Sequence, residues 1–256
     1  MRKEICKICN SESDLIFNKT VLGKYPVDYY YCKNCGFLQT ERPYWLEEAY
    51  HSAINDFDTG LLQRNLYYSK ITSMILVRYF NVNAQFLDYG GGYGIFTRLM
   101  RDIGFKFFTY DPNCPNLFAK EFQFNPEKNH ISLITSWECF EHFEKPLMEL
   151  EKMLKISRNL IFSTRLLPDY IPNPDGWGYY GFLHGQHISF YSRKTFAFIS
   201  KKFNLNYYSA GNLHILTEKR MHPFSLLLLK IFSLYGGFYL IKNIHKIQNG
   251  KHIQNH

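Results

Sequence analysis

The chain has 256 residues, enough for one ordinary domain and a small accessory one. Its many tyrosines and phenylalanines exclude a disordered polypeptide. The formal net charge of +8 is compatible with nucleic acid, an anionic membrane surface or an anionic substrate, and does not choose among them. The N-terminus has no apolar run typical of a signal peptide, and six cysteines in that context favour a reducing compartment. We therefore expect a cytoplasmic protein.

Two Cys-x-x-Cys pairs lie close to the N-terminus, Cys6 with Cys9 and Cys32 with Cys35. Four thiolates can complete a tetrahedral shell around a structural Zn²⁺. Each pair is followed by a residue that tolerates a left-handed turn, Asn10 or Gly36. The spacing predicts a zinc ribbon over residues 1–42. The alternative, two redox dithiols, would require a thioredoxin-like βαβ pattern around a pair, which this sequence lacks.

Residues 43–83 are predicted to form a linker and one amphipathic helix, because apolar residues in 61–80 recur at three- and four-residue steps. From residue 84 onward, strand and helix patterns alternate. Strands are expected at 84–90, 105–112, 130–137 and 158–166, and helices at 94–104 and 145–154. This alternation predicts an α/β domain over 84–220 with a doubly wound parallel sheet.

The turn after the first of these strands has the pattern Asp-x-Gly-x-Gly-x-Gly, with Asp88, Gly90, Gly92 and Gly94. Glycines let the backbone turn tightly and let a ligand approach the start of the following helix. The dinucleotide fingerprint G-x-G-x-x-G does not fit this spacing. The next strand ends at the acidic residue Asp111.

The glycine pattern resembles motif I of the class I S-adenosylmethionine (SAM) methyltransferases. The resemblance implies a Rossmann-like seven-stranded sheet with SAM over the turn, Asp88 serving its cationic methionine end, and Asp111 accepting its ribose hydroxyls. The alternative role for Asp111 is to start an Asp-Pro turn. Other residues at the carboxyl ends of strands are expected beside the cofactor: Tyr93, Ser136 and Trp137.

Residues 138–142 have the pattern Glu-x-x-Glu-His, with Glu138, Glu141 and His142. This resembles a stretch in ubiquinone-biosynthesis O-methyltransferases and small-RNA 2′-O-methyltransferases that bind a divalent cation. The RNA enzymes add a later histidine, for which His187 is the candidate. The resemblance implies a mixed oxygen and nitrogen site for Mg²⁺ or Mn²⁺. Proton transfer, substrate binding and a structural role at a helix start remain alternatives.

Residues 165–192 form a long connection rich in Pro, Gly and aromatics, which we expect to act as a lid. Flat aromatics together with Gln and His suit a sugar, and also a nucleobase. His184 and His187 are the best candidates for a general base, since imidazole titrates in the working range.

The combination of a cysteine-rich ribbon, a SAM-type glycine turn and the lid sequence HGQHISFYS resembles sugar methyltransferases and related proteins of surface-glycan biosynthesis, over residues 1 to about 215. This implies methyl transfer to a sugar or similar hydroxylated small acceptor, which could be nucleotide- or lipid-linked. A second hypothesis is an RNA methyltransferase, favoured by the net charge, the ribbon and the Glu/His set. A third is a non-catalytic zinc-ribbon binding protein.

Residues 221–256 form an apolar extension and a basic tail. The stretch 224–241 is almost entirely apolar, but Lys230 and a Gly-Gly pair interrupt it, and a spanning helix wants about 20 apolar residues. The segment is expected either to pack on the main domain or to make a peripheral membrane contact, assisted by Lys242, Lys246 and Lys251.

Overall fold

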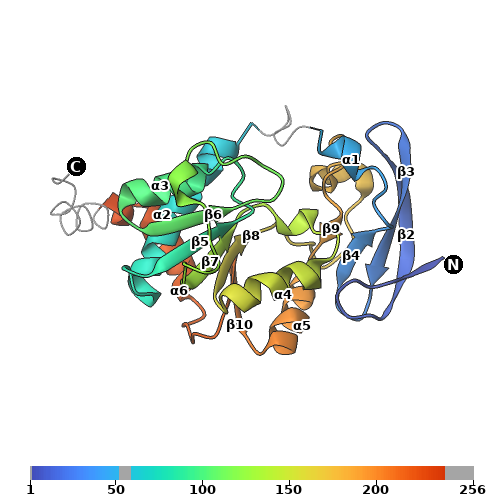
Figure 1. The fold of residues 1–256 in the computed structure, drawn as a ribbon. Helices are drawn as coiled ribbons and strands as arrows, with labels where there is room; N and C mark the ends of the chain where they lie inside the picture. Colours follow the sequence, from blue (N-terminus) through green and yellow to red (C-terminus); the bar gives the residue numbers. More distant parts are fainter. Residues whose placement is uncertain (1, 52–58, 240–256) are drawn as a thin grey trace.

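The computed structural model describes residues 2–51 and 59–239, which fold into two sheets (Figure 1). The first sheet is antiparallel and has the order β1-β2-β3-β4-β9. Its strands are β1 (Lys3–Ile5), β2 (Glu12–Val21), β3 (Tyr25–Cys32), β4 (Phe37–Thr40) and β9 (Ser189–Phe190). Because β9 comes from residues 165–192, the predicted ribbon and the predicted lid share one sheet.

The second sheet has six strands in the order β10-β11-β8-β7-β5-β6. They are β5 (Gln85–Tyr89), β6 (Lys106–Tyr110), β7 (Ile131–Ser136), β8 (Leu160–Ser163), β10 (Asn206–Ala210) and β11 (Leu213–Thr217). The first four pair in parallel, whereas β11 runs antiparallel to both of its neighbours. The expected βα alternation is therefore present.

The predicted seventh strand is not formed in the described part of the chain. Beside β6, where it would lie, the structure has only a single parallel bridge between Thr109 and Gln123. The physical reason is composition: residues 111–130 contain three prolines and four asparagines, which favour turns and interrupt a ladder.

Helices cover both faces of the second sheet (Figure 1). They are α2 (Leu61–Tyr79), α3 (Ile95–Ile103) and α6 (Ser225–Leu234) on one face, and α4 (Pro146–Ile156) and α5 (Arg193–Phe203) on the other. Consecutive strand residues alternate between the two cores. Phe86 packs with α2 and α3, whereas Leu87 packs with α4 and α5. Parallel strands buried on both faces are expected to be mostly apolar, and β8, with the sequence LIFS, is buried along its whole length.

The end of the first sheet that carries the cysteines packs against the core on the α4 and α5 face of the second sheet. Cys6, Cys32 and Phe37 belong to the same buried cluster as Phe196 of α5. The fit is close: a Cβ added at Gly36 would lie 2.3 Å from the Oγ of Ser192, the N-cap of α5. The ribbon is thus fixed to the main domain through its core.

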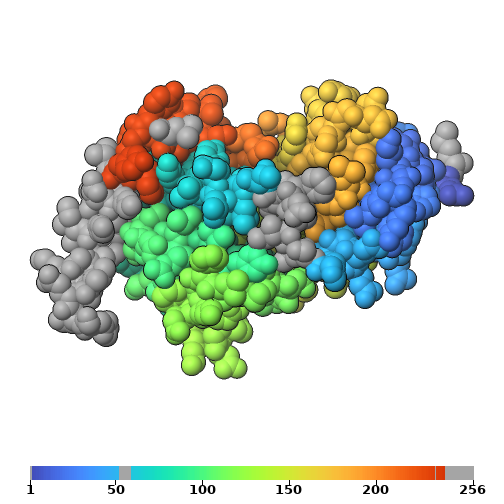
Figure 2. Space-filling view, turned by 90° about the horizontal axis from the view of Figure 1, so that it is seen from above, coloured from blue at the N-terminus to red at the C-terminus, as the bar shows by residue number. Residues whose placement is uncertain are grey.

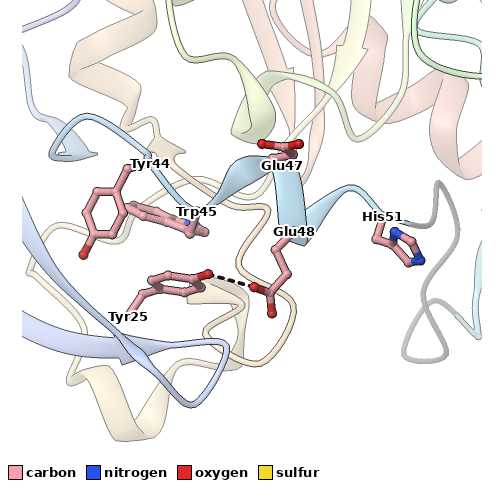
Figure 3. A pocket seen from close by; sticks show the side chains of 6 residues that line it. All are labelled: Tyr25, Tyr44, Trp45, Glu47, Glu48 and His51. Atoms are coloured by element: carbon pink, nitrogen blue, oxygen red, sulfur yellow. Dashed lines mark hydrogen bonds between the residues drawn. The ribbon is translucent and has the colours of Figure 1, made fainter.

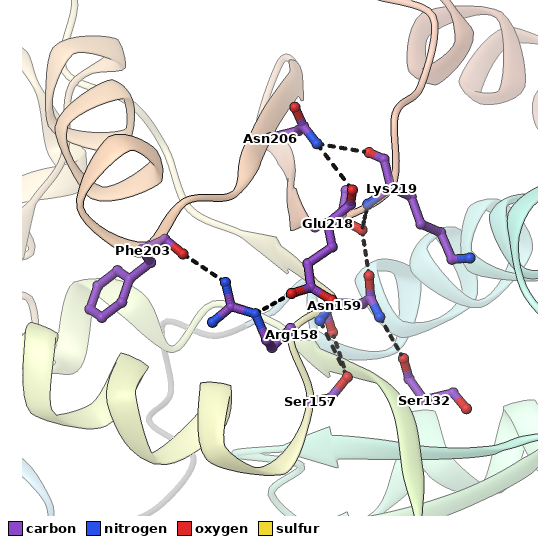
Figure 4. Close-up of polar contacts among 9 residues, drawn as sticks. Ser132, Ser157, Arg158, Asn159, Phe203, Asn206, Glu218 and Lys219 are labelled. Carbon is purple, nitrogen blue, oxygen red and sulfur yellow. Dashed lines mark hydrogen bonds and ion pairs between the residues drawn. The ribbon is translucent and has the colours of Figure 1, made fainter.

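A polar network lies at the amino ends of β7 and β8 in the second sheet (Figure 4). The Arg158 guanidinium donates to the carbonyl oxygen of Phe203 at 2.7 Å and pairs with Glu218. The Asn159 amide donates to the carbonyl oxygen of Ser132 at 3.0 Å. These contacts tie the ends of β7, β11 and α5 together, away from the carboxyl ends of the parallel strands.

None of the helices in the described ranges is both long and apolar enough to cross a membrane.

Candidate functional site

A cavity of about 1060 Å³ lies at the carboxyl ends of β5, β6 and β7, between the second sheet and the lid. The glycine turn, Asp111 and Trp137 line one part of it. Another part is lined by residues of the Glu-His stretch, the lid and the linker: Tyr50, Glu141, His142, Tyr179, His184, Gln186 and His187. One space therefore joins the predicted cofactor residues to the predicted acceptor residues.

The glycine turn needs left-handed backbone at three positions, with φ of 72° at Gly90, 54° at Gly92 and 85° at Gly94. A Cβ added at Gly90 would lie 2.5 Å from the sulfur of Cys139, whereas one at Gly92 would meet no atom within 4 Å. Gly92 also lines the cavity. The turn thus packs tightly at Gly90 and leaves Gly92 open to a ligand.

Asp111 holds the turn from the end of β6. One carboxylate oxygen accepts from the backbone N–H of Gly92 and the other from the N–H of Asn113, both at 2.9 Å. The Asn113 contact is the Asp-turn expected as the alternative role, and the Gly92 contact brings the same carboxylate to the cavity. The two readings of Asp111 are therefore compatible.

Asp88 is almost fully buried beneath the turn. Its carboxylate accepts from the Thr135 hydroxyl at 2.9 Å. Burial raises the pKa of Asp88 to about 7, and the nearby charge of Asp111 contributes in the same direction. A cation placed next to this carboxyl group would favour its ionised form.

Trp137 forms a wall of the cavity with a partner that the sequence analysis did not identify. Its indole stacks on the Tyr68 ring, with centroids 4.1 Å apart and planes 6° apart, and its buried Nε1–H has no hydrogen-bond partner. The neighbouring Ser136 hydroxyl is also buried without a partner. Tyr68 lies on α2, where its spacing is that of an ordinary core residue, so no sequence signal marked it.

Glu141, His142 and His187 meet at the cavity, with one potential ligand atom from each lying within 4.8 Å of the others. Glu141 is fully buried, and neither carboxylate oxygen has a hydrogen bond of good geometry within the described residues, although the Tyr179 and Thr164 hydroxyls are close enough to lower its pKa. Burial raises the pKa of Glu141 to about 8, and the charge of Glu138 adds to the effect. A buried carboxylate without a hydrogen bond of good geometry is costly, so the position is one that a ligand or cation would stabilise.

Glu138 does not belong to this group. Its backbone has a left-handed φ of 51°, and its carboxylate accepts from the Tyr68 hydroxyl at 3.2 Å. Of the four predicted cation ligands, the structure brings three together and places the fourth beside α2.

Backbone carbonyls orient both imidazoles of the cluster. Nδ1 of His187 lies 2.6 Å from the Tyr179 carbonyl oxygen, and Nδ1 of His142 lies 3.1 Å from that of Gln186. A carbonyl only accepts, so Nδ1 of His187 carries the proton and its Nε2 keeps a lone pair, whereas Nδ1 of His142 lies between the Gln186 carbonyl and the Tyr50 hydroxyl. Burial holds the pKa of His187 well below its usual range, with the adjacent His142 contributing.

Further residues position this cluster. The Tyr50 hydroxyl lies 2.9 Å from Nδ1 of His142, and Nδ1 of His184 accepts from the Gln186 N–H at 3.2 Å. The Gln186 side chain donates to the carbonyl oxygen of Ala49 at 2.8 Å. Tyr50 comes from the stretch interpreted as a linker, and nothing in its sequence context distinguished it.

The four N-terminal cysteines converge, with their sulfur atoms all within 4.8 Å of one another. Sulfur pairs lie 3.5 Å apart for Cys6 and Cys35, and 3.4 Å apart for Cys9 and Cys32. A tetrahedral zinc shell with Zn–S bonds of ~2.3 Å places sulfurs ~3.8 Å apart, so the group can hold such an ion with a small expansion. The predicted turn residues have left-handed φ, 58° at Asn10 and 72° at Gly36.

A second, shallower pocket of about 360 Å³ lies where β3 meets α1 (Leu46–Ala49), as Figure 3 shows. The Tyr25 hydroxyl donates to Glu48 at 2.7 Å, and Lys24 pairs with the same carboxylate. Because these polar groups satisfy one another, the pocket offers little to a ligand.

Comparison with known proteins gave one family and a set of solved structures. Residues 62–210 match a family model described as a methyltransferase domain. No curated protein matches the chain. Among solved structures, the plantazolicin methyltransferase BpumL in complex with SAH is 15% identical, with 73% of this chain and 81% of that chain covered and a TM-score of 0.45.

Two further solved structures have comparable similarity. Human N-acetylserotonin methyltransferase in complex with SAM is 15% identical, with 70% and 63% coverage and a TM-score of 0.46. The mitomycin 7-O-methyltransferase MmcR is 14% identical, with 67% and 59% coverage and a TM-score of 0.40. The chain spans about three fifths of each of these two proteins. Because these TM-scores are all below 0.5, the family is assigned from the family match alone, which covers more than half of the chain.

Proposed function

Because the chain belongs to the methyltransferase-domain family, we propose that it transfers a methyl group from SAM to a sugar or a similar hydroxylated small acceptor. The observation that carries this proposal is the single cavity that joins the glycine turn and Asp111 to the Glu141, His142 and His187 cluster. A transferase needs two ligands within reach of each other, and this cavity offers both sides of that arrangement.

SAM would lie over Gly92, the open glycine of the turn. Asp111 would accept the ribose hydroxyls with the lone pairs that its two backbone contacts leave over. Asp88 would face the cationic methionine end, which would draw its carboxyl group into the ionised form. Trp137 keeps a buried N–H on this side of the cavity, whereas Ser136, which was expected beside the cofactor, does not line the cavity.

The acceptor would lie under the lid, against His187. SAM supplies an electrophilic methyl group whose bond to sulfur breaks with both electrons staying on sulfur. Nε2 of His187 accepts the hydroxyl proton as the acceptor oxygen bonds to the methyl carbon. Although burial raises the pKa of the adjacent Glu141, a positive charge on the His187 ring would favour its ionised form, which would stabilise the imidazolium. His142 and His184 would orient the acceptor hydroxyls.

The same cluster fits a divalent cation. One carboxylate oxygen and one ring nitrogen from each imidazole form an ONN donor set, which suits Mn²⁺ better than Mg²⁺, since Mg²⁺ prefers oxygen ligands. A cation held by Glu141, His142 and His187 would lower the pKa of an acceptor hydroxyl. With Glu138 turned toward α2, we do not include it in this set.

The charge of the cavity lining supports a sugar over RNA. Six carboxyl groups line the cavity, and burial raises the pKa of two of them, Asp88 and Glu141. The other four, Asp111, Glu138, Glu144 and Glu149, still outnumber the Lys and Arg side chains of the lining, which are Arg64, Lys145 and Lys152. A phosphate backbone is attracted by Lys and Arg along its path, and an acidic lining repels it. The aromatic and amide groups of the lid suit a hydroxylated ring.

The N-terminal cysteines would hold a structural Zn²⁺. Four thiolates leave no coordination position open for chemistry. Zinc-bound thiolates belong to a reducing compartment, so a cytoplasmic location is part of this proposal.

Two measurements test the proposed function. Titration calorimetry of the zinc-loaded protein with SAM is expected to show one site per chain. Screening nucleotide sugars and short RNAs with methyl-labelled SAM is expected to label a sugar. A folded protein that does not bind SAM would support the non-catalytic alternative, and labelling of RNA alone would replace the sugar acceptor with the RNA one.

A further inference from the structure

Helix α6 has many apolar residues on the side that faces away from the rest of the domain. Leu226 and Ser233 face inward and are at least 97% buried, whereas a stripe on the outward side is exposed. The stripe has the exposed fractions Leu227 48%, Leu228 62%, Ile231 45%, Phe232 50% and Tyr235 84%. These positions follow four-residue steps and therefore form one continuous helix face.

Large aromatic residues extend this face at both ends of the helix. Phe224 precedes α6 and is 65% exposed, and Tyr239 follows it and is 60% exposed. An exposed Tyr or Phe beside an apolar stripe is typical of helices that lie at a membrane interface, where one end of the ring is apolar and the other is wet. Isolated surface leucines need no explanation, but a contiguous apolar face does.

Charge distinguishes the candidate occupants of the face. All 22 acidic residues of the chain precede Lys219, and the 38 residues from Lys219 onward contain six Lys or Arg. Lys219 and Arg220 are exposed just before α6. A second copy of the chain would bring two such positive segments together, which like-charge repulsion disfavours. An anionic bilayer would be attracted by them.

The position of α6 allows this contact without blocking the cavity. It lies at the end of the molecule opposite the ribbon (Figure 2), and none of its residues lines the cavity. Its inner side is fixed by packing on α2 and β10. A flat surface can therefore contact the helix only side-on, along the exposed stripe.

We propose that the outward face of α6, together with the exposed cations Lys219 and Arg220 that precede it, binds the surface of an anionic lipid bilayer. The apolar side chains would enter the headgroup region, and the cations would interact with lipid phosphates. This inference does not rest on methyl transfer, and it would hold for any acceptor.

Sedimentation of the full chain with lipid vesicles tests the proposal. The protein is expected to bind vesicles that contain phosphatidylglycerol, to bind phosphatidylcholine vesicles weakly, and to be released by salt. Leu228→Glu with Phe232→Glu is expected to weaken binding by roughly tenfold or more, because the exposed apolar area of these two side chains would no longer be buried in the bilayer. Because both side chains are at least half exposed, the melting temperature is expected to fall only slightly, and far-ultraviolet circular dichroism is expected to show a folded protein.

The matched control is Leu117→Glu with Phe118→Glu, a leucine and a phenylalanine that are 51% and 56% exposed in the segment after β6. This variant is expected to bind like the wild type. Changing Lys219 and Arg220 to Gln is expected to weaken binding to phosphatidylglycerol vesicles and to reduce its salt dependence.

Three results would overturn the proposal. The first is no sedimentation of the wild type with anionic vesicles. The second is equal loss of binding in the α6 variant and its control, which would indicate non-specific adsorption. The third is a dimer, seen by sedimentation equilibrium without lipid, that the α6 variant dissociates; the face would then be a contact between copies.

Discussion

The indole Nε1–H of Trp45 donates a hydrogen bond to the carbonyl oxygen of Gly185, 2.7 Å away. Trp45 follows the ribbon, and Gly185 comes two residues before His187. A Cβ added at Gly185, whose φ is +67°, would lie 2.8 Å from Val21 and 3.2 Å from Trp45. Together with the pairing of Leu38 and Phe190 across β4 and β9, this contact makes the N-terminal sheet a support for the lid.

Removal of the Zn²⁺ proposed for the cysteine cluster is therefore expected to affect more than the ribbon. Cys32→Ser removes one ligand from a fully buried position, and we expect the ribbon and the lid to lose order together. Calorimetry is expected to show one lowered transition for the whole chain, and methyl transfer is expected to fall with it. Cys114→Ser, outside the cluster, is expected to retain the metal and the melting temperature. An unchanged main transition in Cys32→Ser would mean that the ribbon folds independently.

Replacement of Asp111 tests the cofactor side of the cavity. Asp111→Asn keeps the size of the side chain but weakens it as an acceptor for ribose hydroxyls and for the Gly92 and Asn113 N–H groups. We expect SAM to bind about tenfold more weakly or worse, measured by calorimetry. Asp102→Asn on α3, an exposed residue paired with Arg98, is the control and is expected to bind SAM normally. Equal affinity in the two variants would contradict the ribose assignment.

Sequence patterns predicted the local features and missed those that depend on distant contacts. The helix at 61–80 and the strands from 84 onward follow from periodicity within single segments, and the structure has them at nearly the same positions. The prediction of a seventh strand came from the family resemblance and not from a strand pattern in the sequence. The described part of the chain does not form this strand, because residues 111–130 contain the prolines and asparagines typical of turns.

The acceptor side shows the same limit. Periodicity could not bring His187 to His142, since their meeting depends on the path of the lid. Glu138 leaves the cluster because of its left-handed backbone, which spacing does not encode. Tyr50 was predicted to lie in a linker and Tyr68 in a helix core, and the structure places both at the cavity.

The buried carboxyl group of Asp88 is expected to make stability depend on pH. Its pKa is raised to about 7 in the folded protein, from an ordinary value of 3.8. Between these values the folded state holds a proton that the unfolded state has lost, so stability falls as pH rises from about 4 to about 7. The full span corresponds to on the order of 4 kcal/mol.

Asp88→Asn removes the titration and keeps an acceptor for the Thr135 hydroxyl. Urea unfolding without SAM, measured at several pH values between about 5 and about 8, is expected to give a shallower slope for this variant than for the wild type. Parallel slopes for the two proteins would show that Asp88 does not hold the proton.

The cluster under the lid is expected to control the chemical step and not cofactor binding. His187→Gln and Glu141→Gln each remove a proton acceptor or ligand while keeping side-chain volume, and we expect methyl transfer to fall by about 10² or more. SAM affinity, measured by calorimetry, is expected to stay within about twofold of the wild type, because neither residue lies at the glycine turn. His130→Gln, on the exposed amino-end side of β7, is the control and is expected to retain full activity.

Mn²⁺ binding separates the two ways in which this cluster could act. If it holds a cation, the wild type binds Mn²⁺ in calorimetry or by electron paramagnetic resonance, and Glu141→Gln does not, since the variant loses the one carboxylate of the donor set. Chelation would then abolish methyl transfer even with the ribbon zinc retained. Full activity of protein stripped of that cation would remove the metal role and leave His187 as the base. Full activity of both His187→Gln and Glu141→Gln would remove the cluster from the chemistry altogether.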